Sequence, residues 1–505
     1  MNHLSLVLPE ERWHPSVVAA TARLFSISAP DVEQARVLEI DCGDGGNIIS
    51  IAASLPSSSC TGVALSSEAL DRGRNLISES GLKNVVLHDQ TPADGVFDYI
   101  FLRNTYSRQQ PDIRSEWLSS YAGKLAENGV IVVEHMCYPG WHFLDPIREQ
   151  IQYHTRNIDD AFEKMIAGRQ YLSALSSSIP PRMAQFKKMV RSAWERSTGV
   201  PDVNFGVEYL DTQTRPSYFH QFAETLQGGG YQYLCELAPG SMLINQFPGA
   251  ISAVLPEEAG VIETEQYLDF VTNRTKRVSI LCRAELEIER QIDASVCDGL
   301  YFSAAGLPEN PEQIFQEEET RLTSPYGGTV TVSVPAAKAA LLELCSRFPR
   351  RMQIGEVIDI VRDIHKDFTE ADKVAIYETF AACAVCEIVQ INSDPGQGCA
   401  TLSEKPVASS LIRAQARIRS IPHVSSLQHR SVPVDQMDCL LLEMLDGNND
   451  KAALIAKFRE LVEKQSITLK RDDKPVADEA TVEEIASQQI DRFLETYLAR
   501  GFLES

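Results

Sequence analysis

The chain has 505 residues, of which 44% are hydrophobic and 23% are charged, and its formal net charge is −23 at pH 7. This composition indicates a globular protein of about three domains and excludes a largely disordered chain. We find no apolar run long enough to span a bilayer and no secretory leader, so we expect a cytoplasmic protein without membrane insertion.

The strong negative charge would repel a phosphate backbone, so nucleic acid is not an expected partner. Basic or lysine-bearing partners suit this charge better. Alternatively, the acidity serves only to keep the protein in solution.

Short apolar runs alternate with amphipathic stretches from residue 36 to about 135. The runs RVLEI, CTGVAL, NVVLH, FDYIFL and GVIVVEHM are expected to be strands, and the stretches NIISIAASL, SSEALDRGRNLISESG and SEWLSSYAGKLAENG to be helices. Repeated strand–helix–strand units predict a doubly wound sheet with right-handed crossovers. Ligands of such sheets bind at the carboxyl ends of the strands.

The middle of the chain is expected to be mainly helical. Residues 145–200 are rich in helix formers, with a break at the two prolines of SSSIPPRM. A helix is expected from Tyr218 to the glycines at 228–230, followed by a strand. A second helical stretch is expected over residues 263–285.

The last third contains a weak internal duplication. The stretch LLELC at 341–345 recurs as LLEML at 441–445, and the stretch that begins at Glu378 corresponds to the one that begins at Glu495. Each copy is expected to form three helices and a short strand, as in a winged helix. The copies carry many acids and no basic recognition helix, which favours packing or protein contact over DNA binding.

These patterns predict four parts of the chain. We expect a sheet domain over residues 1–145, a mainly helical middle domain over 146–300, and winged-helix-like units over 301–425 and 426–505.

Eleven cysteines lie in apolar contexts, which favours reduced, buried thiols over a disulfide framework. Cys383 and Cys386 have the spacing of a metal-binding pair, but no second pair or nearby histidine completes a site. We therefore expect core helix there and no metal site.

The stretch VLEIDCGDGGN, residues 37–47, places a glycine-rich turn after the first expected strand. A P-loop would need a lysine after Gly46, where Asn47 stands. A dinucleotide fingerprint would need G-x-G-x-x-G, whereas Gly43, Gly45 and Gly46 form G-x-G-G. Once these two motifs are excluded, the pattern that remains is an acid followed by spaced glycines.

This turn resembles motif I of class I S-adenosylmethionine-dependent methyltransferases, E/D-x-G-x-G-x-G. Glu39 takes the acidic position, and Gly43 and Gly45 take the second and third glycine positions. In this motif the glycines let the backbone approach the methionyl part of the cofactor, and acidic groups pair with its ammonium and sulfonium charges.

Further segments are similar, in this order, to bacterial methyltransferases with a methyltransferase regulatory domain: WHPSVVAATARLF, CGDGGN, YPGWH, PSYFHQF, EQYLDFVTNR and LLLEMLDG. That family includes protein-lysine methyltransferases of the rickettsial outer-membrane-protein type. The resemblance covers nearly the whole chain. It implies a Rossmann-like class I methyltransferase domain followed by a helical middle domain and a C-terminal α+β part, with S-adenosylmethionine as cofactor, a protein or peptide as acceptor, and a possible homodimer.

The resemblance also implies which residues meet the cofactor. They are Glu39, Asp41, Cys42, Gly43, Gly45, Asn47, Leu65, Ser66, Asp89, Gln90 and Arg103. For the four residues that follow the second and third strands, a solvated loop is the alternative.

The sequence departs from the family pattern at two cofactor positions. Asp41 stands at the first glycine of motif I, and Ala64 stands where the family usually places an acid that binds the ribose hydroxyls. Losing that acid would weaken cofactor binding about tenfold to a hundredfold or more. A noncatalytic scaffold or regulatory partner with a degenerate site is therefore the alternative to an enzyme, and a DNA-binding regulator is a third hypothesis.

Methylation of lysine requires a neutral amine, and neutralising lysine at pH 7 costs about 4.6 kcal/mol, which a base or desolvation can offset. Tyr106, His135 and Tyr138 follow or end the fourth and fifth strands, and we expect them to form the acceptor channel. His135 is expected to accept a proton, and the tyrosines to orient the amine. Structural roles are favoured for Trp141, His142 and His220.

Overall fold

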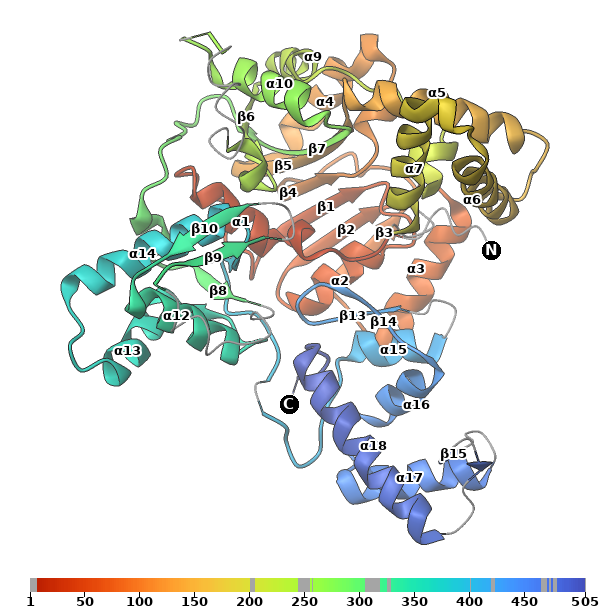
Figure 1. The fold of residues 1–505 in the computed structure, drawn as a ribbon, viewed down its shortest axis with the longest axis vertical. Helices are drawn as coiled ribbons and strands as arrows, with labels where there is room; N and C mark the ends of the chain where they lie inside the picture. Colours follow the sequence, from red (N-terminus) through yellow and green to blue (C-terminus); the bar gives the residue numbers. More distant parts are fainter. Residues whose placement is uncertain are drawn as a thin grey trace.

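A seven-stranded sheet forms the centre of the molecule (Figure 1). The computed structural model describes residues 7–199, 205–243, 255–256, 258–304, 318–324, 328–399, 401–418, 423–464, 470–471, 474–475 and 479–504. In spatial order, the strands of the sheet are β3 (Val85–His88), β2 (Ser59–Val63), β1 (Arg36–Ile40), β4 (Phe97–Leu102), β5 (Leu125–Met136), β7 (Lys276–Arg283) and β6 (Tyr231–Glu236).

The first five strands are parallel, whereas β7 runs antiparallel to both β5 and β6. The central strands β1 and β4 are buried at every residue except Arg36, because both faces of the sheet are covered. Because β1 to β5 run parallel, their carboxyl ends meet at one edge of the sheet. The predicted positions of these five strands and the doubly wound arrangement are confirmed.

Helices cover both faces of the sheet. On one face, α1 (Pro15–Arg23), α2 (Gly46–Ser54) and α3 (Ser67–Ser80) pack in a core that includes Val37 and Phe101. The other face is covered by α4 (Arg114–Ser119), α9 (Phe219–Leu226) and the start of α10 (Val261–Thr272). Short helical turns complete this region at Glu11–Trp13, Tyr106–Arg108, Pro111–Ile113, Ala122–Lys124, Gln227–Gly229 and Pro239–Met242.

Two helix predictions were wrong in part. The helix expected over 115–129 ends at Ser119, because Leu125 already pairs with Phe97 as β5 begins. The helix expected over 263–285 ends at Thr272, where Asn273 takes a left-handed conformation, and the residues after it form β7. The segment VSILC is rich in residues that favour strands, and it fills the place between β5 and β6.

The sheet takes strands from both sides of residue 145. Strands β6 and β7 lie within the range expected for the helical middle domain, yet they complete the sheet. The expected helices of this range are present as α5 (Gly140–His154), α6 (Ala161–Ser178) and α7 (Ala184–Thr198), with the break at the prolines and a separate apolar core. A π-helical turn, Gly206–Leu210, packs beside them. The division at residue 145 stays a prediction.

The C-terminal part contains two units in which the first strand position lies between the other two. In the first unit β8 (Tyr301–Ser303) lies between β11 (Met352–Gln353) and β12 (Gln390–Asn392), and its helices are α12 (Pro335–Ser346), α13 (Ile354–Ile364) and α14 (Glu370–Val385). A turn, Ala294–Cys297, precedes this unit, and the hairpin of β9 (Thr320–Thr323) and β10 (Thr329–Val332) is inserted before α12.

The second unit follows this order with shorter strands, but its described residues form one helix more than the three expected and one further hairpin. Residues Val407 and Ala408 lie between Asp446 and Leu503, as β8 lies between its two neighbours. Its other elements are α15 (Ser410–Ile418), β13 (His423–Ser425), β14 (Ser431–Pro433), α16 (Gln436–Met444), α17 (Lys451–Glu463), β15 (Lys470–Arg471), β16 (Lys474–Pro475) and α18 (Glu479–Ala499). The helices that contain LLELC and most of LLEML occupy equivalent positions, as the duplication predicts.

The cysteines are free thiols, and nine of the eleven are buried. The described part of the chain contains no group of three histidine, cysteine or acidic residues that could hold a metal ion, and Cys383 and Cys386 lie in the core at the end of α14. No helix in the described ranges is both long enough and apolar enough to cross a membrane.

Candidate active site

The turn after β1 has the backbone conformation that the motif requires. Asp41, Gly43 and Gly45 have φ angles of 59°, 57° and 82°, and α2 begins at Gly46. The left-handed region favours glycine, but aspartate is among the other residues that enter it most readily. Asp41 therefore adopts a conformation that glycine would also tolerate, and it does not prevent the turn from forming.

The N-terminal segment, residues 7–13, lies over this turn. The backbone N–H of Val7 donates to Oδ1 of Asp44 at 3.2 Å, and a Cβ on Gly46 would lie 2.0 Å from the carbonyl oxygen of Val7. Only glycine fits at position 46 while this segment is in place. The side chain of Cys42 is buried in the core below, so only its backbone can face a ligand.

The carboxylate of Asp41 is bound to Arg108, a residue that the sequence analysis did not select. The Nη1 of Arg108 donates to Asp41 at 2.8 Å, and its Nε donates to Asp211 at 2.8 Å. Burial raises the pKa of Asp41, and Arg108 opposes that rise. The three side chains carry a net charge of −1 when both acids are ionised, and they lie at the carboxyl end of β1.

Glu39 is fully buried below the turn. Its Oε1 accepts from Nδ2 of Asn47 at 3.2 Å, whereas its Oε2 is buried without a hydrogen bond among the described residues. Burial raises the pKa of Glu39 to about 7. The side chain therefore changes its protonation near neutral pH, directly beneath the turn.

Asn47 also connects this turn to the C-terminal part of the chain. Its Oδ1 lies 2.8 Å from Nε2 of His429, whose Nδ1 lies 2.9 Å from Oγ of Ser50. Because an amide oxygen can only accept, Nε2 of His429 carries the proton and Nδ1 accepts from the serine. Burial lowers the pKa of His429 well below its usual value, so the ring is neutral. No local motif near residue 429 could have indicated this contact.

Four residues that follow β2 and β3 form an open rim, Leu65, Ser66, Asp89 and Gln90, whereas Ala64 is buried beneath them. Leu65 is 66% exposed, Asp89 and Gln90 are exposed, and Ser66 caps α3 by accepting from Ala69 N at 3.5 Å. The strands end side by side, with Val63 paired to His88. The predicted rim residues are therefore brought together, but Ala64 contributes no carboxylate to them.

Arg103 points toward the N-terminal segment. Its Nη2 donates to Glu10 at 2.6 Å, and its guanidinium lies 4.5 Å from the ring centre of Trp13. These contacts hold Glu10 and Trp13 against the end of β4. Arg103 is 8% exposed, and we infer that it secures the segment that covers the turn.

His135 and Tyr106 are buried within the fold. The ring of His135 stacks on Phe222 at 4.0 Å between ring centres, and Tyr106 packs edge-on against both. Burial lowers the pKa of His135 to about 3. A ring that is fully buried and neutral throughout the physiological range is poorly suited to the predicted proton-accepting role. The Oη of Tyr106 already bonds to Thr225 at 3.1 Å.

Tyr138 is the predicted acceptor residue that remains partly open to solvent. Its ring stacks on His142 at 3.8 Å and lies 5.4 Å from the ring of Tyr218. Phe270, 48% exposed, lies 6.1 Å from Tyr218. Burial raises the pKa of Tyr138, so its hydroxyl stays protonated. These rings form an aromatic surface beyond the end of β5.

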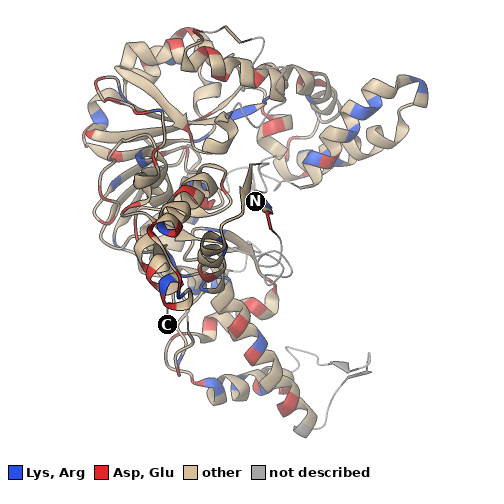
Figure 2. Ribbon diagram, turned by 60° about the vertical axis from the view of Figure 1, so that its left-hand side comes forward, with Lys and Arg blue, Asp and Glu red and all other residues tan. Residues whose placement is uncertain are grey.

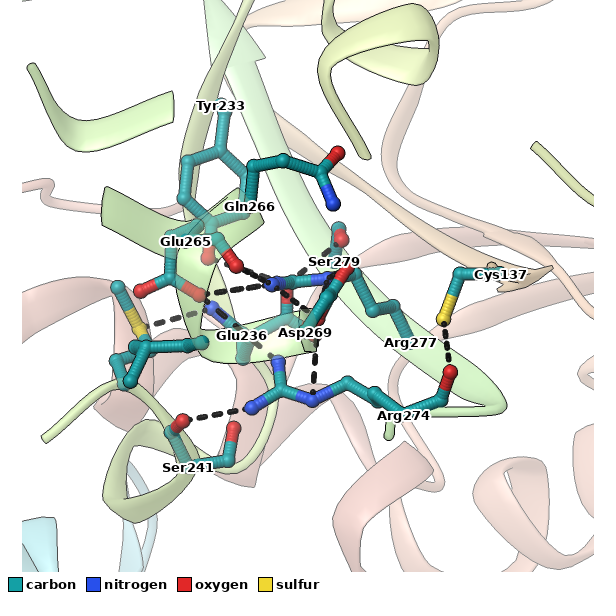
Figure 3. Close-up of polar contacts among 12 residues, drawn as sticks. Cys137, Tyr233, Glu236, Ser241, Glu265, Gln266, Asp269, Arg274, Arg277 and Ser279 are labelled. Carbon is teal, nitrogen blue, oxygen red and sulfur yellow. Dashed lines mark hydrogen bonds and ion pairs between the residues drawn. The ribbon is translucent and has the colours of Figure 1, made fainter. Parts of the chain in front are cut away.

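A buried ionic cluster joins β6, β7 and α10 next to this surface, and Figure 3 shows its polar contacts. Arg277 of β7 binds Glu236 at 2.7 Å, Glu265 at 3.0 Å and Asp269 at 2.7 Å, and Arg274 approaches Asp269 at 3.4 Å. The carbonyl of Arg274 accepts from Gly140 N at 3.1 Å. The cluster thereby positions the loop that contacts the residues after β5.

The residues at the site fit part of S-adenosylmethionine. Asp41, Gly43 and Gly45 give the turn its left-handed backbone, and the buried oxygen of Glu39 has capacity for a further donor. Arg108, Asp41 and Asp211 offer charged groups for an amino acid moiety. The residues at the turn therefore fit the methionyl half of the cofactor, whereas Ala64 supplies no acid for the ribose hydroxyls.

Three family models match separate parts of the chain. They describe a methyltransferase domain at residues 38–131, a predicted methyltransferase regulatory domain at 206–283, and the C-terminal winged helix domain of PKMT at 404–502. The regulatory-domain match ends at β7, so it includes the two strands that complete the sheet.

Comparison with individual proteins extends the likeness to nearly the whole chain. The uncharacterized protein RP789 of Rickettsia prowazekii is 23% identical over 97% of this chain and 91% of its own length. RP028 of the same organism is 27% identical over 44% of this chain and 90% of its own length. The structure of PKMT2 from Rickettsia typhi in complex with AdoHcy superposes with a TM-score of 0.86 at 23% identity, covering 99% of this chain and 100% of that chain.

Proposed function

Because the chain carries a methyltransferase domain, a methyltransferase regulatory domain and a PKMT winged helix domain, we propose that it is an S-adenosylmethionine-dependent methyltransferase acting on lysine in a protein or peptide. The motif I turn carries this proposal. It combines Glu39 with three left-handed positions at the carboxyl edge of the sheet. The choice of lysine and of a protein acceptor rests on the likeness to PKMT2 from Rickettsia typhi.

Each part of the site has a proposed role. The turn and Glu39 hold the methionyl half of the cofactor, and the rim after β2 and β3 receives its nucleoside. The bound cofactor supplies an electrophilic methyl group. Tyr138 orients the acceptor amine through its hydroxyl, and the surrounding rings exclude water, which favours the neutral form of that amine.

A noncatalytic relative is the second candidate, and specific residues favour it. Ala64 removes the ribose acid, and Asp41 already engages Arg108, which would otherwise be available to a ligand carboxylate. Both features weaken cofactor binding without altering the fold. The two candidates therefore differ in cofactor affinity and turnover.

Calorimetry with S-adenosylmethionine and S-adenosylhomocysteine distinguishes them. We expect both ligands to bind, and Ala64→Asp to tighten binding about tenfold to a hundredfold, because a hydrogen bond to a carboxylate contributes roughly 1.5–3 kcal/mol. Ala64→Asn is the matched control for size, since it adds a similar side chain without the charge. Failure of the wild type and of Ala64→Asp to bind either ligand at millimolar concentration would exclude the enzyme.

A further inference from the structure

A groove of about 350 Å³ lies between α5, α7 and the loop after α10. Its apolar walls include Leu144, Ile147 and Ala193, which are buried, and Phe143, which is 55% exposed. Lys188 and Arg196 lie at its border on α7. The size falls within the range of small-ligand pockets, and an apolar groove with a basic border suits a peptide side chain and a neighbouring carboxylate.

The groove adjoins the aromatic surface around Tyr138. Gly140 and Thr275 line the groove, and the Thr275 carbonyl accepts from Cys137 N at 2.9 Å. A Cβ on Gly140 would lie 2.2 Å from the carbonyl oxygen of Asn273, so these walls touch. An extended peptide in the groove, with about 3.3 Å per residue, would reach Tyr138 within a few residues.

The segment that contains α7 has a charge opposite to that of the whole chain, and two of its basic side chains, Lys188 and Arg196, line the groove. Residues 182–196 contain five basic side chains and one acid, a net charge of +4, in a chain with a net charge of −23. They appear as blue stretches on the helical hairpin at the upper right of Figure 2. Arg191 pairs with Glu195 at 2.8 Å and Arg196 with Glu208 at 3.5 Å, whereas Lys188 is exposed and has no ion pair within the described residues.

We propose that this groove binds the acceptor segment that flanks the methylated lysine, and that this segment carries an acidic residue beside an apolar one. The inference rests on the proposed function and specifies its acceptor. A nucleic acid fits less well, because a phosphate backbone would lie on Phe143, Leu144 and Ile147, which offer no hydrogen-bond donors from their side chains.

Fluorescence anisotropy with labelled peptides tests the groove without turnover. The probe peptide contains a lysine with a leucine and two glutamates within five residues, and the comparison peptides replace both glutamates by glutamine or the leucine by serine. We expect the full-length protein to bind the acidic apolar peptide at least fivefold more tightly than either comparison peptide. Equal binding of all three peptides would overturn the inference, as would tighter binding of duplex DNA or RNA.

Two adjacent lysines provide a matched pair of variants. Lys188→Glu lies in the groove, whereas Lys187→Glu makes the same charge change one residue away, outside the lining. We expect Lys188→Glu to weaken the acidic peptide about fivefold to tenfold, and Lys187→Glu less than twofold. Phe143→Ser should weaken it without changing the charge. Equal effects of the two lysine variants would overturn the inference.

Failure of this inference is distinguishable from failure of the proposed function. If the protein binds S-adenosylmethionine and methylates protein lysine while Lys188→Glu leaves peptide binding unchanged, only the groove assignment is wrong. If the protein binds neither S-adenosylmethionine nor S-adenosylhomocysteine, the enzymatic proposal fails, whatever the peptides show.

Discussion

At the scale of single residues, the departure from motif I at position 41 changes charge more than shape. Asp41 adopts a φ of 59°, as a glycine would, and its carboxylate turns to Arg108. The residue therefore does not block the turn. Its consequence is that Asp41 pairs with Arg108, a cation that could otherwise bind the cofactor.

Replacing Asp41 by glycine tests this consequence. Glycine tolerates the left-handed conformation, and the change releases one nitrogen of Arg108. We expect Asp41→Gly to tighten S-adenosylmethionine binding about threefold to tenfold in calorimetry, because a guanidinium binds a carboxylate strongly. In an Arg108→Ala background the gain should vanish. Weaker binding by Asp41→Gly would instead show that the Asp41 carboxylate itself contacts the cofactor.

Glu39 makes stability depend on pH. Burial raises its pKa from 4.5 to about 7, so the folded protein holds a proton that the unfolded chain has already released. The resulting stabilisation is fully present below pH 4.5 and is lost as the pH rises to about 7. Between pH 5 and pH 8, the thermal midpoint of the wild type should fall further than that of Glu39→Gln.

Exposed Glu33 provides the control for this measurement, since Glu33→Gln removes a carboxylate that is solvated at the surface. This variant should follow the wild type between pH 5 and pH 8. Identical pH dependence for Glu39→Gln and the wild type would contradict a buried, protonated Glu39.

At the scale of elements, β7 links the sheet to the acceptor side of the site. Its Arg277 pairs with acids from β6 and α10, and Ser279 of the same strand lies 3.3 Å from Nε2 of His135. The hydroxyl of Ser279 also donates to Glu236 at 2.9 Å. His135 is thus part of the buried support of the site, which explains its place at the end of β5.

Removing the charge of Arg277 should destabilise the sheet edge. Arg277→Ala leaves three buried acids without their main partner, and breaking a buried ion pair costs about 3–5 kcal/mol. Chemical denaturation should show a loss of this size. The control is Arg283→Ala on the same strand, because among the described residues Arg283 donates to the backbone carbonyls of Ala122, Leu125 and Ala126 and to no acid. A loss no larger than that of the control would contradict the role of the cluster.

At the scale of the whole molecule, the second C-terminal unit contacts α2, the helix that follows the motif I turn. His429 bonds to Asn47 and Ser50, Arg430 binds Glu11 at 2.6 Å, and Arg417 lies 3.7 Å from Glu79 of α3. Figure 1 shows this unit below the sheet, with β13, β14 and α15 nearest to α2 and α3. The second C-terminal unit therefore helps to support the motif I turn.

His429→Ala should weaken both stability and cofactor binding. The change leaves Asn47 and Ser50 buried without one partner each, and an unsatisfied buried group costs about 1–3 kcal/mol. Thermal unfolding measures the first effect and calorimetry with S-adenosylhomocysteine the second. His423→Ala, in the nearby strand β13, is the control because its half-buried ring makes no comparable bonds in the described structure. Equal behaviour of the two variants would contradict the link.

The sequence by itself determined the five parallel strands, the motif I turn and the two repeated C-terminal units. These features depend on apolar periodicity and turn residues within short segments, which adjacent residues reveal. The helix expected across Lys276–Arg283 was wrong because a segment that also fits a helix was required between two strands far away in the chain.

Only the tertiary structure decided how the site is supported. His429 and Asn47 are 382 residues apart, and Arg108 reaches Asp211 across 103 residues. The burial that leaves His135 neutral comes from the packing of β5 against α9 and β7. Such contacts depend on where complete elements lie in space, because burial and hydrogen bonding are set by neighbours in the fold and not by neighbours in the chain.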